Sequence, residues 1–89
     1  IRLTNVARKQ IGRLPDHIQC KFEYWKDLII HMGLREARKY KGFHDEPLHG
    51  KRSGERSVRL SKSYRIIYRE IRNEKHDILE ILEVNKHEY

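Results

Sequence analysis

Apolar residues in the first half of the chain recur at helical spacing. One stripe consists of Ile18, Phe22, Trp25, Ile29 and Met32, at steps of four, three, four and three residues. These steps place the side chains on one face of an α-helix, for which Gly33 is a natural stop. An aromatic stripe of this kind is typical of a buried helix face, so we expect Phe22 and Trp25 to lie in the core.

Shorter patterns flank this helix. Thr4 can cap a first helix, and Pro15 ends that helix or opens the next one. The apolar positions of the first helix are Ala7, Ile11 and Leu14. Residues 34–40 can form a further short helix, while residues 1–3 have the character of the end of a strand. The first half of the chain is therefore predicted to be mainly helical.

The second half of the chain has the pattern of strands. The predicted strands are residues 57–60, 64–71 and 78–84, which are rich in Val, Ile and Tyr. Short polar turns at 61–63 and around Asn73 separate them, and such turns force neighbouring strands to run antiparallel. Residues 41–56 contain three glycines and a proline. We expect this stretch to be a long loop, and long ordered loops are often functional.

Together these elements predict an α+β fold in a single domain over residues 1–89. An N-terminal strand and two or three helices would pack on one face of an antiparallel sheet that ends in a three-stranded meander. Of the 89 residues, 37% are hydrophobic and 37% are charged. This proportion suffices for one modest core and little more.

Charge adds a bias toward anionic partners. Lys and Arg number 20 against 13 Asp and Glu, which gives a net charge of +7. A surplus of this size in a small domain favours nucleic acid or an acidic protein segment as a partner. The sequence shows neither an apolar run long enough for a membrane span nor a signal peptide, so we expect a cytoplasmic protein with no membrane partner.

Metal and cofactor chemistry find little support in the sequence. Cys20 is the only cysteine, so there is no disulfide framework or thiolate zinc site, and we expect its thiol to be buried on a helix. The six histidines lack a recognisable ligand spacing. Neither a glycine-rich phosphate loop nor a dinucleotide fingerprint is present. We therefore expect no metal and no cofactor.

The turn at residues 61–63 sets the register of the two strands that it joins. With three residues in the turn, Val58 lies opposite Ile66, and Arg59 lies opposite Arg65 on the other face of the sheet. Two guanidinium groups across a ladder repel each other. The pair is tolerable if it is solvated, if carboxylates lie nearby, or if the site holds an anion such as phosphate.

Other candidates gather near this arginine pair. They are Glu46, Lys51 and Arg52 from the predicted loop and His87 and Tyr89 from the tail. The tail reaches Arg65 if the last strand flanks segment 64–71. In RNA cleavage, a base takes the proton of a 2′-hydroxyl, cations hold the charge on the phosphate, and an acid protonates the departing 5′-oxygen. A carboxylate, two arginines and a histidine can fill these roles without a metal.

The same residues carry a family resemblance. Four runs carry it: Glu46-Pro47-Leu48-His49-Gly50-Lys51-Arg52-Ser53-Gly54, Ser57-Val58-Arg59-Leu60, Tyr64-Arg65-Ile66-Ile67-Tyr68 and Val84-Asn85-Lys86-His87-Glu88-Tyr89. In these runs the sequence resembles the RelE/ParE superfamily of type II toxins, above all its HigB and YoeB branches. The resemblance implies a RelE-like fold and ribosome-dependent cleavage of messenger RNA in the decoding site. It also implies an antitoxin protein as the inhibitory partner.

The resemblance further implies a role for each candidate. These roles are Glu46 as general base, Arg65 as phosphate stabiliser with Arg59 as the arginine of the preceding strand, His87 as acid or orienter, and Tyr89 as a stacking or assisting group. One departure leaves the roles of the tail open, because Glu88 separates the histidine from the tyrosine, which are adjacent in YoeB-like tails. Lysines replace the glutamate base in RelE-like members, so Lys51 can share that role. The residues that we expect to contact RNA are Lys51, Arg52, Arg56, Lys62 and Lys86.

Two alternative functions compete with this interpretation. One is a ParE-like toxin, which inhibits DNA gyrase without nuclease activity; the tail residues His87 and Tyr89 argue against it. The other is a nucleic-acid-binding module with no chemistry. Glu46 discriminates here, because a carboxylate beside phosphate hinders binding but serves proton transfer.

Overall fold

The computed structural model describes residues 1–72 and 77–86 of the chain. Its elements are, in order, β1 (Arg2–Leu3), α1 (Asn5–Gly12), α2 (Asp16–Met32), α3 (Leu34–Ala37), the 3-10 turn η1 (Lys41–Phe43), β2 (Glu46–Pro47), the 3-10 turn η2 (Gly50–Arg52), β3 (Glu55–Arg59), β4 (Tyr64–Arg72) and β5 (Asp77–Lys86). The strands form one sheet in the order β1-β5-β4-β3-β2. β1 pairs with β5 in parallel, and the other neighbours are antiparallel.

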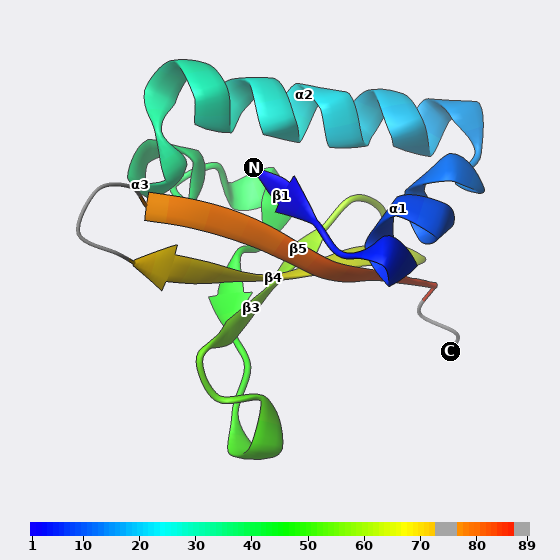
Figure 1. Ribbon diagram of the computed structural model, residues 1–89. Helices are drawn as coiled ribbons and strands as arrows, with labels where there is room; N and C mark the ends of the chain where they lie inside the picture. Colours follow the sequence, from blue (N-terminus) through cyan, green and yellow to red (C-terminus); the bar gives the residue numbers. More distant parts are fainter. Residues whose placement is uncertain (73–76, 87–89) are drawn as a thin grey trace.

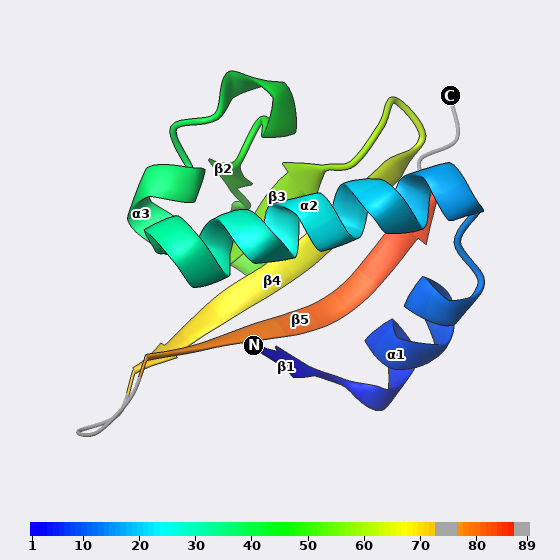
Figure 2. The same ribbon diagram turned by 90° about the horizontal axis from the view of Figure 1, so that it is seen from above.

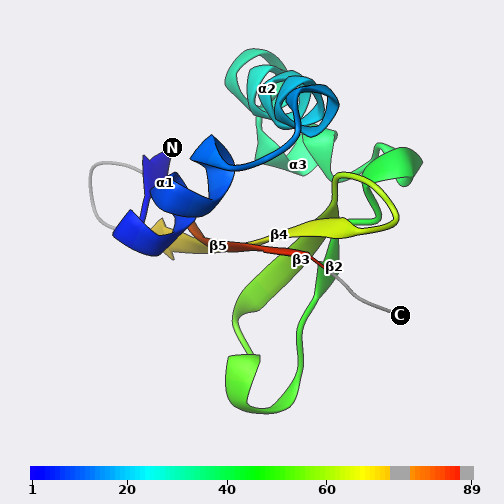
Figure 3. The same ribbon diagram turned by 90° about the vertical axis from the view of Figure 1, so that its right-hand side faces the viewer.

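The helices cover one face of this sheet, as predicted for an α+β fold. Seen from the side and from the end, α1, α2 and α3 all lie on the same side of β4 and β5 (Figures 1 and 3). The hairpin of β2 and β3 projects on the other side. One face of the sheet is therefore buried beneath the helices, and we call the opposite face the open face. None of the helices in the described part of the chain could span a membrane.

The core forms where α2 lies across the sheet (Figure 2). Phe22 is 3% exposed and Trp25 is 1% exposed, which confirms the predicted burial of this stripe. The ring of Trp25 lies 5.7 Å from that of Tyr68 on β4, which is completely buried. Tilted aromatic contacts at this separation stabilise a core beyond the area that they bury.

Two expectations for α2 were wrong. Met32 is 46% exposed, because it lies in the last turn of the helix, where the chain turns at Gly33 with a φ of 85° into α3. Cys20 is also exposed. It lies two positions from Ile18 and from Phe22, and two residues rotate a side chain by about 200° to the opposite side of a helix.

The predicted loop at 41–56 has more structure than expected. It contains η1, β2, η2 and the first residues of β3. β2 escaped prediction because it has only two residues, both exposed, and Pro47 lacks the N–H group of a regular strand. Its existence depends on pairing with β3, which local sequence patterns do not reveal.

The side chains of Thr4, which precedes α1, and of Gln10 within α1 complete the outer edge of β5. β1 covers that edge only at Glu80 and Ile81. Beyond them, the Thr4 hydroxyl donates to the Leu82 carbonyl at 2.6 Å, and the Val84 N–H donates to the Gln10 side chain at 2.6 Å. Thr4 also caps α1, as predicted. No strand pairs with this part of the outer edge of β5 in the described structure. The two contacts therefore satisfy a backbone carbonyl and a backbone N–H group that would otherwise lack a partner.

Replacing Trp25 by alanine tests the packing of α2. Because Trp25 is buried against Tyr68, we expect Trp25→Ala to lower the free energy of unfolding by about 3–5 kcal/mol. Ile30→Ala is the control, since Ile30 lies on the same helix and is 64% exposed. It should change the free energy of unfolding by less than about 0.5 kcal/mol. Urea unfolding followed by circular dichroism measures both variants, and equal losses would contradict the packing.

Candidate functional site

The predicted arginine pair is present on the open face. Arg59 on β3 lies directly opposite Arg65 on β4. One position along, Val58 lies opposite Ile66, and both are completely buried beneath the helices. Because side chains alternate between the faces of a strand, burial of the apolar pair turns both arginines to the open face.

A third strand extends this row. Arg65 also pairs with Asn85 on β5, so an amide lies beside the two guanidinium groups. The prediction that the end of the last strand lies beside Arg65 is therefore confirmed as far as Lys86. His87 and Tyr89 lie outside the described residues, and their predicted roles remain predictions.

The next row on the open face ends in two carboxylates. Its members are Glu46 on β2, Ser57 on β3, Ile67 on β4 and Glu83 on β5, each paired with the next. From ideal strand dimensions, the Cα atom of Glu83 lies about 8 Å from that of Arg65, and the Cα atom of Glu46 about 12 Å from it. Glutamate and arginine side chains are long enough to meet across these separations. The open face thus brings Glu46 into the neighbourhood of the arginine pair.

The loop of the β2–β3 hairpin is tied to the same face. Arg52 in η2 pairs with Glu55 at 2.7 Å and with Glu83 on β5 at 2.5 Å. The hydrogen bond to Glu83, followed by that to Glu55, raises the pKa of Arg52 above its ordinary value. The guanidinium of Arg52 therefore serves first to hold the hairpin against the sheet. Lys51, its neighbour, is exposed.

Two of the residues predicted to bind RNA, Arg56 and Lys86, lie on the other side of the sheet from the arginine row. Arg56 pairs with Tyr68, which places it on the helix-covered face, where it binds Asp45. Lys86 pairs with Tyr64, one position from Asn85, and so alternates to the helix side at the end of the sheet. Lys62 is exposed in the turn between β3 and β4.

Sequence reasoning missed Glu83 and Asn85. Both lie on β5, whose register with β4 shifts between Ile67 and Tyr68. The shift falls at Leu82, on the other side of Glu83 from Val84, so Glu83, Val84 and Asn85 keep a regular alternation. One signal in the sequence could have found them. Glu83 and Asn85 flank the apolar Val84 in a strand, and alternation places both side chains on the face opposite to that of Val84.

The arginine pair is not neutralised by a carboxylate of the described residues. Within residues 1–72 and 77–86, neither Arg59 nor Arg65 forms an ion pair with a carboxylate. The nearby Glu83 and Glu55 are both bound by Arg52. Two like charges held side by side repel each other, and an anion that binds both relieves the repulsion.

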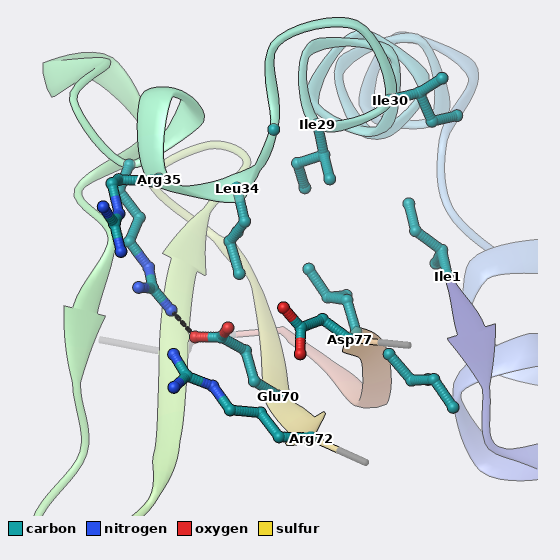
Figure 4. Close-up of a pocket in the computed structure, with 12 residues that line it drawn as sticks. Ile1, Ile29, Ile30, Leu34, Arg35, Glu70, Arg72 and Asp77 are labelled. Atoms are coloured by element: carbon teal, nitrogen blue, oxygen red, sulfur yellow. Dashed lines mark hydrogen bonds and ion pairs between the residues drawn. The ribbon is translucent and has the colours of Figure 1, made fainter. Parts of the chain in front are cut away.

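A separate hollow lies on the helix side. It has a volume of about 460 Å³ and is bounded by the last turn of α2, α3 and the ends of β4 and β5 that lie farthest from the arginine row (Figure 4). Ile29 and Leu34 form part of its apolar wall, and Glu70 and Arg72 contribute polar groups. It contains none of the predicted site residues. Within the described residues, no group of three or more His, Cys, Asp or Glu side chains could hold a metal ion.

Comparison with known proteins identifies the fold. No protein-family model and no curated protein sequence matches the chain. The structure of YafQ from E. coli strain BL21(DE3) superposes with a TM-score of 0.72 at 19% identity, over 96% of this chain and 89% of that one. A YoeB/ParE toxin from Agrobacterium tumefaciens superposes with a TM-score of 0.69 at 23% identity, over 99% of this chain and 100% of that one. A chain of the RelBE2 toxin–antitoxin complex from Mycobacterium tuberculosis superposes with a TM-score of 0.63 at 24% identity, over 97% of this chain and 94% of that one.

The chain has the fold of the RelE/YoeB-like type II toxins. The predicted fold class is thereby confirmed over nearly the whole chain. In this toxin fold, the arginine row lies on the sheet face that the helices leave uncovered, near the C-terminal end of β5.

A second charged cluster on the open face stabilises the toxin fold. Glu80 on β5 is only 7% exposed and binds Arg69 on β4 and Arg2 on β1, each at 2.8 Å. The hydrogen bond from Arg69, aided by Arg2, holds the pKa of the Glu80 carboxyl below its ordinary value of 4.5 despite burial. The cluster thus joins three strands through one ionised carboxylate.

The depressed pKa of Glu80 predicts acid sensitivity. A carboxyl whose pKa is lower in the folded state stabilises the fold above its unfolded pKa, and this stabilisation is lost as the pH falls through the folded pKa. We therefore expect that, as the pH is lowered below about 4.5, the free energy of unfolding decreases less steeply in Glu80→Gln than in the unsubstituted chain. Urea unfolding at a series of pH values measures this slope. Glu36→Gln, at an exposed site on α3, is the control and should keep the original slope.

Proposed function

We propose that this protein is the toxin of a type II toxin–antitoxin system and an endoribonuclease that cuts messenger RNA on the ribosome. The observation that carries the proposal is the Arg59–Arg65 pair on the open face, with Glu46 and Glu83 in the adjacent row. Paired guanidinium groups suit a phosphodiester, and a carboxylate beside them suits proton transfer. The likeness to YoeB and RelE toxins supports the same conclusion.

The proposed reaction needs no group from outside the chain and its substrate. Glu46 takes the proton of a ribose 2′-hydroxyl, and the 2′-oxygen attacks the adjacent phosphorus. The bond from phosphorus to the 5′-oxygen breaks, and His87 gives that oxygen a proton. The products are a 2′,3′-cyclic phosphate and a 5′-hydroxyl. Arg65 and Arg59 stabilise the charge that grows on the phosphate in the transition state.

Removing Arg65 or Glu46 tests this chemistry. A group that acts mainly in the transition state lowers the rate of cutting more than it lowers binding. We expect Arg65→Ala and Glu46→Gln each to slow cleavage of ribosome-bound messenger RNA by about 10²–10⁴-fold in single-turnover assays. Binding to ribosomes should persist, because the other basic residues keep most of the electrostatic attraction.

Two neighbours on α3 provide matched controls. Arg35→Ala and Glu36→Gln make the same chemical changes at exposed positions on the helix side. Both should cut at the unsubstituted rate. A Glu46, Arg65, His87 triple variant that stops growth at full potency would overturn the nuclease proposal. It would favour a ParE-like gyrase inhibitor, which needs the surface but not these groups.

We also propose two partners, the ribosome and an antitoxin. The net charge of +7 supports binding to ribosomal RNA, and the protein would then act in the cytoplasm. Two of the similar structures, RelBE2 and the E. coli DinJ–YafQ complex, are toxin–antitoxin complexes; the second superposes with a TM-score of 0.71 at 21% identity, over 97% of this chain and 89% of that one. An acidic or apolar antitoxin segment across the basic surface would block access to RNA.

Salt dependence tests the electrostatic part of this proposal. A protein that displaces several counterions from nucleic acid loses on the order of 10³-fold or more in affinity between about 50 and 200 mM salt. We expect a steep decrease of this kind when the protein is co-sedimented with ribosomes over a salt series. Binding that does not change with salt would contradict it. Full nuclease activity of a stable toxin–antitoxin complex would contradict the inhibitory partner.

A further inference from the structure

A buried carboxylate lies one residue before Glu46. The side chain of Asp45 is only 2% exposed. One of its oxygens accepts a hydrogen bond from Arg56 Nε at 2.6 Å, and the other accepts one from the Tyr68 hydroxyl at 2.5 Å. Arg56 also donates to the Asp45 backbone carbonyl at 3.4 Å. A charged group at such depth needs partners of this kind, because desolvation without them is expensive.

The partners of Asp45 come from several elements. Tyr68 lies on β4 and Arg56 on β3, while Arg38 at the end of α3 donates to the Tyr68 hydroxyl at 3.3 Å. Burial, followed by the hydrogen bond to Asp45, raises the pKa of Tyr68 well above its ordinary value, so the hydroxyl remains a donor. Arg38 is in turn paired with Glu70 on β4. The segment before β2 is thus fixed to the core by side chains and not only by its backbone.

The backbone around Glu46 offers little support of its own. β2 has two residues at the edge of the sheet, and Pro47 cannot donate a ladder hydrogen bond. His44, just before Asp45, adopts the left-handed conformation with a φ of 45°. An edge strand this short has little independent stability, since most of its stabilisation must come from packing.

Alternation then links the two neighbouring residues. Successive side chains of an extended strand point to opposite faces. With Asp45 anchored beneath the helices, the next side chain, that of Glu46, is directed to the open face, in the row that ends at Glu83. A shift of the segment by one residue would bury the glutamate and expose the aspartate.

We propose that Asp45, held by Tyr68 and Arg56, is a positioning residue that fixes the Glu46 carboxylate toward the RNA. This inference rests on the proposed function, in which Glu46 is the general base. Asp45 touches no reacting atom and acts only through its neighbour. A misplacement of about 1 Å in a catalytic group can slow a reaction by about 10²-fold, so a loosened anchor should be visible in the rate.

A double-mutant cycle separates positioning from general support of the fold. We expect Asp45→Asn to lower kcat by about 10–100-fold with KM nearly unchanged, because the cluster lies on the other face from the RNA. In the Glu46→Gln background, the same substitution should cause no further loss, since there is no base left to position. Single-turnover and steady-state cleavage of ribosome-bound messenger RNA measure both effects, and thermal unfolding confirms that each variant is folded.

Glu80→Gln is the matched control. It also disturbs a largely buried carboxylate with two arginine partners on the same sheet. It should lower the melting temperature but leave kcat unchanged in both backgrounds. If Asp45→Asn does not fold, Tyr68→Phe replaces it in the same double-mutant cycle. This substitution keeps the ring in the core and removes one hydrogen-bond donor to Asp45, so we expect a smaller loss of kcat.

The outcomes distinguish this inference from the function on which it rests. A Glu46→Gln variant with full activity would remove the base role itself, and the positioning role with it. A slow Glu46→Gln variant that Asp45→Asn slows further by its full factor would overturn the positioning role alone. A fall in kcat for Glu80→Gln equal to that for Asp45→Asn would likewise assign the effect to general stability.

Discussion

The register between β3 and β4 is the constraint on which the rest of the structure depends. It places Val58 and Ile66 together under the helices, where both are completely buried. A slip of one residue would exchange the faces, exposing these two side chains and burying Arg59 and Arg65. Burying two unpaired guanidinium groups is far more expensive than the loss of any single contact. The core therefore determines where the arginines lie.

The turn between the strands reinforces this register. The Ser61 hydroxyl accepts hydrogen bonds from the backbone N–H groups of Ser63 and Tyr64, at 3.1 and 3.2 Å. The Leu60 N–H donates to the Tyr64 carbonyl at 2.9 Å and closes the hairpin. Serine favours turns through such local bonds to the backbone. Local turn chemistry and distant core packing thus agree on one pairing, which is why the register could be predicted from the sequence.

Other parts of the site could not be predicted in this way. β2 is too short to show a period, and the place of Glu83 beside Ile67 depends on the pairing of β4 with β5. Asp45 gave no signal, because a buried aspartate and an exposed one are identical in sequence, and its hydrogen-bond partners are 11 and 23 residues away. Alternation could therefore place the arginine pair, whereas the carboxylates around it depend on long-range pairing that only the structure reveals.

The same long-range pairing joins the core to the open face. The ring of Tyr68 lies against Trp25, while its hydroxyl binds Asp45. Packing of α2 on the sheet thus restrains the ring, the ring restrains the carboxylate, and the backbone carries this restraint by one residue to Glu46. Because each member of this series is buried or bonded to a buried partner, a change in core packing can alter the direction of a side chain on the opposite face. In so small a protein, stability and site geometry therefore depend on the same few residues.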